Sequence, residues 1–264
     1  MNIFRFFGDM SHTASILVLL LKLRASKSAA GISLKTQELF LVVFVTRYLD
    51  LFYRFYSVYN SFMKVLYIGL TSLTIYMIRE HIPTKATYDK SQDSFLHWKF
   101  AVAPCAVLGL IIHSWDWWGK WSAFFALGNY FWTFSEVLEP LAIVPQLIVL
   151  QRYREVENLT GHYVFLLGVY RSLYILNWVY RAYYEFGYQH HILVYIAGLV
   201  QTLLYADFFY YYALSKYYGG RMSSPGDLGQ SPEETEKLVF TSQRRKPQQK
   251  QQQQRTRRTD RSRL

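Results

Sequence analysis

Seven apolar stretches, each near the length that crosses a bilayer, constrain this chain more than any other feature. A run of about 20 apolar residues spans the hydrocarbon core as a helix. The 264 residues are 52% hydrophobic and only 18% charged, so little of the chain lies outside such stretches. We therefore predict an all-α membrane protein with seven transmembrane helices. The predicted spans are residues 3–21, 38–56, 62–78, 98–113, 121–149, 162–181 and 192–214.

The first and fifth predicted spans depart from a plain apolar helix. The fifth contains Pro140, which lacks a backbone N–H and is expected to kink it. The first carries Arg5, Asp9 and His12, and no small-residue cleavage site follows it. A signal peptide would have such a site after an uncharged core. We therefore expect the first span to remain in the protein as a helix.

Lys and Arg are concentrated in alternate connections between the spans. Several Lys and Arg lie in three connections, at residues 22–35, 79–90 and 150–157. The connection at residues 182–191 contains none. Basic connections face the cytosol, so the N-terminus is predicted to be lumenal and the C-terminus cytosolic. The sequon at Asn158 would then lie in the cytosol, where it stays unmodified.

Residues 216–264 form a polar tail after the seven-helix domain of residues 1–215. Gly, Pro, Ser and Gln dominate the tail, and it has no apolar period, so we predict that it is disordered. From Arg244 onward nine Lys or Arg stand against one acid, Asp260. Such a tail can lie near anionic lipid of the cytosolic leaflet, or it can be a basic sorting signal for a coat complex. A nucleic-acid partner is not expected for a membrane-tethered tail.

Polar side chains recur at helical spacing inside four of the spans. Arg47, Asp50 and Arg54 follow at i, i+3 and i+7, which would place them on one face of a helix. Ionisable groups in membrane helices usually face the bundle interior or a wet cavity. The other stripes are Arg5 and His12 in the first span, Asn129, Trp132, Glu136 and Glu139 in the fifth, and Tyr170, Tyr174, Asn177, Trp178 and Arg181 in the sixth.

Two interpretations of these stripes compete. Asp50 could pair with Arg47 or Arg54 on its own helix, and Arg5 and Arg181 could extend to the lumenal surface. Taken together, however, the arginines predict a positively charged cavity that opens to the lumen. Such a cavity favours an anion that presents several carboxylates. His12 is either a buried structural group or a group that gains charge between about pH 5 and 8.

No combination of residues indicates catalysis. The sequence contains no HExxH, CxxC or Gly-rich phosphate loop, and we can assemble no Ser-His-Asp arrangement. We therefore predict a protein that is not an enzyme and that needs neither a cofactor nor a metal. His190 and His191 are interpreted as a solvated pair in a lumenal loop. Cys105 is the only cysteine, so no intrachain disulfide can form.

Long blocks of this sequence resemble the KDEL receptors, also called ER lumen protein-retaining receptors. The resemblance covers most of residues 1–215, in order, with small insertions near residues 79–83 and 114–128. The blocks are MNIFRFFGDMSH, AGISLKTQELF, TRYLDLF, YNSFMKVLYI, KATYD, WTFSEVLEPLAIVPQL, GHYVFLLGVYRSLYILNWVYR and AGLVQTLLYADFFY.

The resemblance implies a fold and a function. The fold is seven transmembrane helices, in which two three-helix bundles flank a linking helix, as in PQ-loop and sugar-transporter proteins. The Pro145–Gln146 pair resembles the PQ pair of that fold. The function is to bind C-terminal KDEL- or HDEL-type tetrapeptides of escaped ER residents in the acidic Golgi and to release them in the neutral ER.

The resemblance also implies roles for single residues. The terminal carboxylate of the peptide would meet Arg47 beside Tyr48, and its acidic side chains would meet Arg5 and Arg181. Trp132 and Trp178 would line the pocket, and residues 171–181, Arg171 included, would form much of its wall. His12 would sense pH near a tight hydrogen bond between Tyr170 and Glu139, and Asp207 would be needed for return transport.

Several positions depart from the family pattern. Asn129 stands where animal receptors have a glutamate, Arg54 replaces a small polar residue, and Glu136 replaces an apolar one. The first two changes bear on the residue that is fourth from the end of the ligand. The long tail replaces a short lysine-bearing tail read by the COPI coat, so Lys216 and Arg221 are further candidates for recycling. Two alternatives remain: a small-solute transporter of this fold, and a relative that no longer binds retrieval signals.

Overall fold

The computed structural model describes residues 2–116, 123–152, 158–188 and 191–217, and all regular secondary structure in these ranges is helical. The predicted tail lies outside the described ranges beyond residue 217. The α-helices are α1 (Ile3–Ser26), α2 (Leu34–Arg47), α3 (Val58–Arg79), α4 (Ile82–Lys85), α5 (Ala103–Asp116), α6 (Ala123–Ala142), α7 (Val144–Arg152), α8 (Asn158–Tyr184) and α9 (Ile192–Tyr217). A 3-10 helix (Tyr48–Phe52) follows α2, and a π-helical turn (Trp98–Val102) precedes α5.

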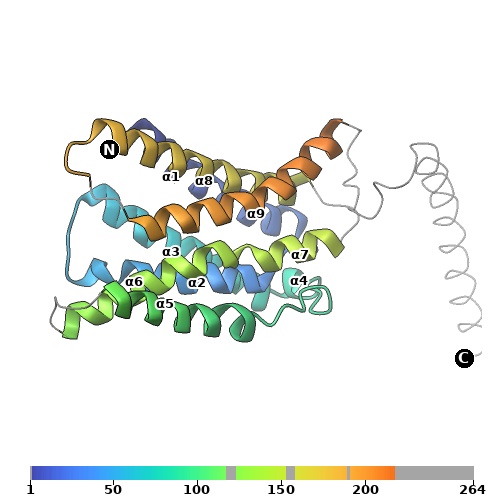
Figure 1. Cartoon of the computed structure of the whole chain (residues 1–264). Coiled ribbons are helices and arrows are strands. Elements are labelled where there is room, and N and C mark those ends of the chain that lie inside the picture. The colour runs from blue at the N-terminus through green and yellow to red at the C-terminus, as the bar shows by residue number, and fades with distance from the viewer. Residues whose placement is uncertain (1, 117–122, 153–157, 189–190, 218–264) are drawn as a thin grey trace, which may run out of the picture. The chain divides into compact units, whose positions relative to one another are not determined.

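Within the described residues, four helical stretches are long and apolar enough to cross a bilayer on their own. They are Ile3–Ser26, Val58–Arg79, Leu127–Arg152 and Ile192–Tyr210. Helices α2, α5 and α8 run alongside them in the bundle (Figure 1) and complete the seven predicted spans. They are shorter or more polar, and a neighbouring helix can cover their polar groups. The prediction of an all-helical, multi-pass membrane protein is confirmed.

The helices form two groups of three. Helices α1 and α2 both pack against α3, and helices α6 and α8 both pack against α9 (Figure 1). The groups are joined where α1 lies against α8 and α2 lies against α6, and α5 packs on α6 from outside. This is the predicted arrangement of two three-helix bundles with a linking helix.

Local sequence signals explain where several helices begin and end. Asn2, Ser33 and Ser57 cap α1, α2 and α3, since each side chain accepts a hydrogen bond from a backbone N–H in the first turn. The third helix therefore begins at Val58, four residues before the predicted start. The α-helical part of the second span ends at Arg47, well short of the predicted residue 56.

The predicted break in the fifth span occurs at Ile143, between α6 and α7. Pro140 and Pro145 flank this residue, and neither can donate the backbone hydrogen bond that a continuous helix would require. The break sets α7 apart from α6, and Gln146 of α7 lies against the start of α2.

Gln146 and Asp93 organise the end of the bundle where α2 begins. The Gln146 side chain accepts a hydrogen bond from the Ser33 backbone N–H at 2.8 Å and donates one to the Gly31 carbonyl at 2.8 Å. Asp93 accepts hydrogen bonds from the Ser33 hydroxyl at 2.8 Å and the Tyr88 hydroxyl at 2.7 Å. We call these five residues the Gln146–Asp93 network. It ties α7 and the connection after α4 to α2 with buried, mutually satisfied groups.

Candidate ligand-binding site

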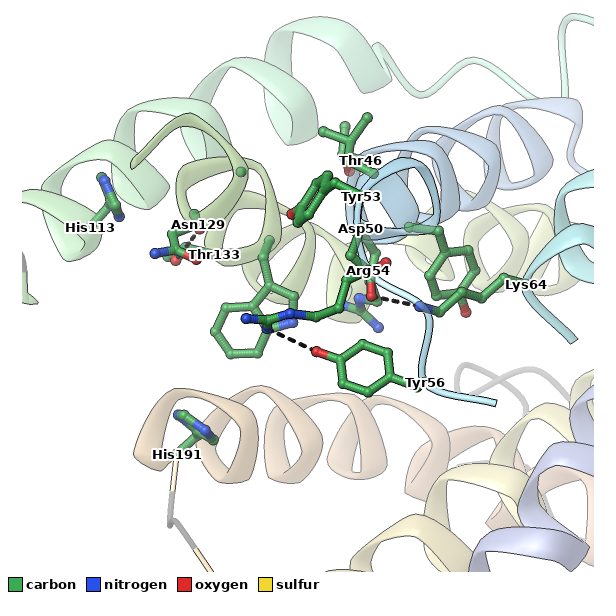
Figure 2. A pocket seen from close by; sticks show the side chains of 15 residues that line it. Thr46, Asp50, Tyr53, Arg54, Tyr56, Lys64, His113, Asn129, Thr133 and His191 are labelled. Atoms are coloured by element: carbon green, nitrogen blue, oxygen red, sulfur yellow. Dashed lines mark hydrogen bonds and ion pairs between the residues drawn. The ribbon is translucent and has the colours of Figure 1, made fainter. Parts of the chain in front are cut away.

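A cavity of about 560 Å³ lies at the opposite end of the bundle, where α2 ends and α3, α6 and α9 begin (Figure 2). The residues that line it come from the end of α2 and the segment after it, and from α3, α5, α6 and the start of α9. They are Thr46, Arg47, Tyr48, Leu49, Asp50, Tyr53, Arg54, Tyr56, Lys64, His113, Gly128, Asn129, Trp132, Thr133 and His191.

Positive charge predominates in this lining. Arg47, Arg54 and Lys64 carry it, and the only carboxylate among the lining residues is Asp50. The Lys64 ammonium lies 2.7 Å from an Asp50 oxygen, so Asp50 already has a cationic partner. The sequence analysis considered that Asp50 could pair with Arg47 or Arg54 on its own helix, but its ion pair is with Lys64 on α3. Lys64 is the partner that the sequence analysis missed, although a lysine within the apolar helix α3 was a signal.

Arg54 does not share a helical face with Arg47 and Asp50. The α-helix ends at Arg47, the 3-10 helix ends at Phe52, and Arg54 lies in the irregular segment that follows. Its exposed guanidinium donates a hydrogen bond to the Tyr56 hydroxyl at 3.0 Å (Figure 2). The change of helix type redirects the side chains, but Arg54 still lines the cavity.

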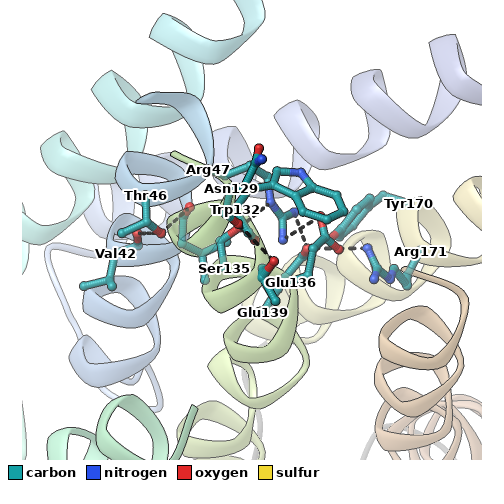
Figure 3. Close-up of polar contacts among 12 residues, drawn as sticks. Val42, Thr46, Arg47, Asn129, Trp132, Ser135, Glu136, Glu139, Tyr170 and Arg171 are labelled. Carbon is teal, nitrogen blue, oxygen red and sulfur yellow. Dashed lines mark hydrogen bonds and ion pairs between the residues drawn. The ribbon is translucent and has the colours of Figure 1, made fainter. Parts of the chain in front are cut away.

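Arg47 joins the cavity to a buried cluster of charges on α6 (Figure 3). Its Nη1 donates a hydrogen bond to Glu139, and its Nε donates one to the Ser135 hydroxyl at 3.1 Å. Its Nη2 lies 3.2 Å from a Glu136 oxygen. The Arg47 side chain is nevertheless 17% exposed, which leaves it accessible from the cavity. Glu136 and Glu139 are both buried, so the guanidinium compensates two carboxylates that water does not solvate.

Glu139 connects this cluster to α8 and α1. The Tyr170 hydroxyl donates a hydrogen bond to Glu139, and an Arg171 nitrogen lies 3.2 Å from the same carboxylate oxygen. The imidazole ring of His12 stacks on the Tyr170 ring, with centroids 4.3 Å apart. The structure thus brings together the three residues that the resemblance connects with pH sensing. Their role in sensing stays a prediction.

Asp9 is the centre of a second buried network, which the sequence analysis missed as a site. Its carboxylate accepts hydrogen bonds from the hydroxyls of Tyr59, at 2.9 Å, and Tyr174. The Tyr67 hydroxyl donates to the Asp9 carbonyl at 3.1 Å. Gly8 permits this approach, because a Cβ there would lie 2.8 Å from the Tyr174 ring. The available signal was an acid between Arg5 and His12 in an apolar span.

The predicted site residues of α1 and α8 lie outside the lining of the cavity. Arg5 is half-buried and forms no ion pair with another described residue, whereas the Arg181 Nε lies 2.6 Å from a Glu185 oxygen. The buried Asn177 accepts a hydrogen bond from the Asn2 side chain at 2.8 Å. The guanidinium of Arg171 lies 5.4 Å from the centre of the Trp178 ring, a cation–π arrangement.

The remaining predicted residues divide between the cavity and the far end of α9. Tyr48, Asn129 and Trp132 line the cavity. His191 also lines it, with its ring 5.7 Å from the Trp132 ring, so its interpretation as a solvated loop residue is incomplete. His113 is a further lining residue that the sequence analysis missed. Asp207 and Lys216 lie on the last turns of α9, and His190 and Arg221 fall outside the described residues.

The arrangement suits anion binding better than metal binding. The part of the chain that the structure describes contains no cluster of three or more His, Cys, Asp or Glu residues that could hold a metal ion. Cations at the cavity and aromatic rings beside them are instead the groups that bind carboxylates and exclude water from them.

Comparisons with known proteins identify the family of this chain. The family model of the ER lumen protein retaining receptor matches residues 28–181. Receptor B of Arabidopsis thaliana is 54% identical over 215 residues, which cover 81% of this chain and 95% of the relative. The receptors of Drosophila melanogaster and Plasmodium falciparum are 47% and 45% identical over 225 residues, which cover 85% of this chain and 100% and 98% of the relatives. This multi-pass membrane protein of the secretory pathway therefore belongs to the ER lumen protein-retaining receptor family.

Proposed function

We propose that this protein binds C-terminal retrieval signals of the KDEL or HDEL type on soluble ER proteins and returns those proteins to the ER. One observation supports this proposal most strongly. The cavity presents three permanent cations, and its one lining carboxylate is already paired with Lys64. A peptide that ends in Asp-Glu-Leu presents three carboxylates, counting its C-terminus, and could bind these cations in competition with Asp50, Glu136 and Glu139.

The terminal carboxylate is proposed to bind at Arg47. The Nη2 of Arg47 has no hydrogen-bond partner among the described residues, but it is buried 3.2 Å from a Glu136 oxygen, so a carboxylate that binds this donor would have to displace Glu136. Arg5 and Arg181 are proposed to receive the acidic side chains of the peptide. Arg181 would have to leave Glu185, an exposed partner that costs little to exchange.

Acidic pH is proposed to strengthen binding through His12. This side chain is buried beside Tyr170, and a proton on it would add positive charge close to Glu139 and Arg47. Binding in an acidic Golgi and release in a neutral ER would follow, because histidine changes charge between about pH 5 and 8.

The orientation and the tail are parts of the same proposal. The cavity lies at the end of the bundle that carries the N-terminus, which the distribution of Lys and Arg assigns to the lumen. The C-terminal tail would then face the cytosol, near anionic lipid and within reach of coat proteins. Asp207, Lys216 and Arg221 are the proposed determinants of return transport.

A transporter function has less support. Alternating access would require the far end of the bundle to open, where the Gln146–Asp93 network joins α2, α7 and the connection after α4 through satisfied hydrogen bonds. An enzymatic function is likewise not proposed, since neither the family nor the site indicates one.

Peptide binding as a function of pH tests the proposal. Purified full-length protein would be titrated with a fluorescent octapeptide that ends in HDEL and with a scrambled octapeptide of equal charge. We expect saturable binding of the first peptide that is tighter at pH 5.5 than at pH 7.5. Equal binding of both peptides, or solute flux in proteoliposomes without peptide binding, would contradict the proposal.

A further inference from the structure

Glu136 introduces a second buried carboxylate beside Arg47. It lies on α6 at i−3 from Glu139, so both side chains project from the same face of that helix (Figure 3). Trp132, one turn before it, lines the cavity, whereas Glu136 is not among the lining residues. An anion in the cavity would therefore meet Arg47 first and would find Glu136 behind it.

The contact between Glu136 and Arg47 is one of charge without a well-aligned hydrogen bond. The two groups are 3.2 Å apart, yet the Nη2 of Arg47 has no hydrogen-bond partner among the described residues. Glu139, in contrast, accepts hydrogen bonds from Arg47, Tyr170 and Arg171. Glu136 is therefore the carboxylate that Arg47 can give up at lower cost.

The charges of the buried centre balance before any ligand is present. Arg47 and Arg171 carry two positive charges, and Glu136 and Glu139 carry two negative charges. A ligand carboxylate at Arg47 would leave one excess negative charge in a buried place, which is costly. Either the binding weakens or a proton enters the site.

We propose that Glu136 is an internal competitor for Arg47, which weakens ligand binding at neutral pH and so adds a second contribution to the acid dependence ascribed to His12. The inference rests on the proposed function, because it concerns the carboxylate of a bound peptide. The ligand carboxylate binds Arg47 in place of Glu136. The negative charge left on Glu136 is neutralised when Glu136 gains a proton. The competition is strongest at neutral pH, where Glu136 is ionised and no proton offsets it.

The groups that face Glu136 determine whether a proton can be taken up there. Arg47 approaches from α2 and favours the ionised form, and Arg171 from α8 adds to this effect. Glu139 on its own helix has the opposite effect, because two neighbouring carboxylates repel. A ligand carboxylate would likewise repel the ionised form of Glu136 and favour its protonated form. The other titratable groups around the centre are Tyr48 after α2, Tyr170 on α8, His191 at the start of α9, and His12 on α1, which stacks on Tyr170.

Binding measurements on Glu136→Gln and Glu136→Leu in the full-length protein test the inference. The glutamine variant keeps the shape of the side chain without its charge. The leucine variant removes the polar group altogether and serves as a second test if the buried amide disturbs folding. Glu80→Gln is the matched control, since Glu80 is exposed and pairs with Lys85 at the other end of the bundle. Each protein is titrated with the HDEL octapeptide from pH 5.5 to 7.5.

We expect both Glu136 variants to bind on the order of tenfold more tightly than the unmodified protein at pH 7.5. The gain should shrink toward pH 5.5, and the control should match the unmodified protein. Unchanged or weaker binding by both Glu136 variants, while the unmodified protein binds the peptide, would overturn the inference alone. A gain that stays constant with pH would overturn the part that concerns acid dependence. Absence of peptide binding by every protein at every pH would overturn the proposed function and the inference with it.

Discussion

The two ends of the helix bundle both contain buried polar groups, but they use them differently. At the Gln146–Asp93 end, amide, hydroxyl and carboxylate groups satisfy one another and the backbone. Burial and the hydrogen bond to Asp93 raise the pKa of Tyr88 above its ordinary value, so this hydroxyl remains a donor at physiological pH. At the cavity end, the Arg47 side chain stays partly exposed, and its buried Nη2 lies beside Glu136 without a well-aligned hydrogen bond. Complete pairing stabilises the fold, and incomplete pairing leaves capacity to bind a ligand.

Removing Arg47 should have the largest effect. Arg47→Ala takes away the proposed carboxylate partner and leaves Glu136 and Glu139 with too little positive charge. Truncating one member of a buried charge cluster costs about 2–5 kcal/mol, so we expect at least about thirtyfold weaker peptide binding. Thermal unfolding measured in parallel separates lost folding from lost binding. A folded variant with unchanged affinity would remove Arg47 from the site.

Removing Gln146 should affect stability rather than binding. Gln146→Ala leaves the Ser33 N–H and the Gly31 carbonyl without their side-chain partner. Each orphaned group costs about 1–3 kcal/mol where it is buried, so we expect the free energy of unfolding to fall by about 2–6 kcal/mol, toward the lower end because the Gly31 carbonyl is only partly buried. Gln146→Met is the comparison variant, since it keeps the length of the side chain but loses both the acceptor and the donor, and should cost nearly as much. If peptide affinity fell more than stability, the two ends would not be functionally separate.

Replacing His12 should flatten the pH dependence of binding. The groups around this imidazole are Tyr170 and Arg171 on α8, Tyr67 on α3, Arg47 on α2 and Glu139 on α6. A proton on His12 in the bound state makes binding strongest at acidic pH and weaker as pH rises through the histidine range. His12→Ala should lose most of this change between roughly pH 5.5 and 7.5. His81→Ala, an exposed histidine at the other end, should keep it.

An unchanged pH profile in His12→Ala would place the sensor elsewhere. If Glu136→Gln flattened the profile instead, the proton would be bound at the α6 carboxylates rather than at the histidine.

The smallest expected effect concerns the fourth residue from the ligand's end. Arg54 is exposed, so water and salt screen its repulsion of a lysine there, and we expect only a small change in affinity. We expect HDEL or DDEL to bind better than KDEL in competition at acidic pH. Arg54→Ser and Asn129→Glu should both shift the preference toward lysine. A preference for KDEL in the unmodified protein would mean that Arg54 does not read this residue.

The sequence predicted the fold better than it predicted the pairing of charges. The length of the apolar stretches predicted the spans, and Pro140 predicted the break near Ile143. Both features depend only on local chemistry. The end of α2 was missed, since residues 44–58 contain neither Gly nor Pro to mark the change to a 3-10 helix. The pairing of Asp50 with Lys64 joins two helices, and helical spacing within one span carries no information about a neighbour's side chain.

The central claim is that the incompletely paired end of the bundle binds a free peptide carboxylate at Arg47. Two HDEL octapeptides that differ only at the C-terminus, one a carboxylate and one an amide, test it most directly at pH 5.5. The account predicts that the unmodified protein binds the carboxylate at least about tenfold more tightly, and that Arg47→Ala loses this difference. Equal affinity for the acid and the amide in the unmodified protein would contradict the account.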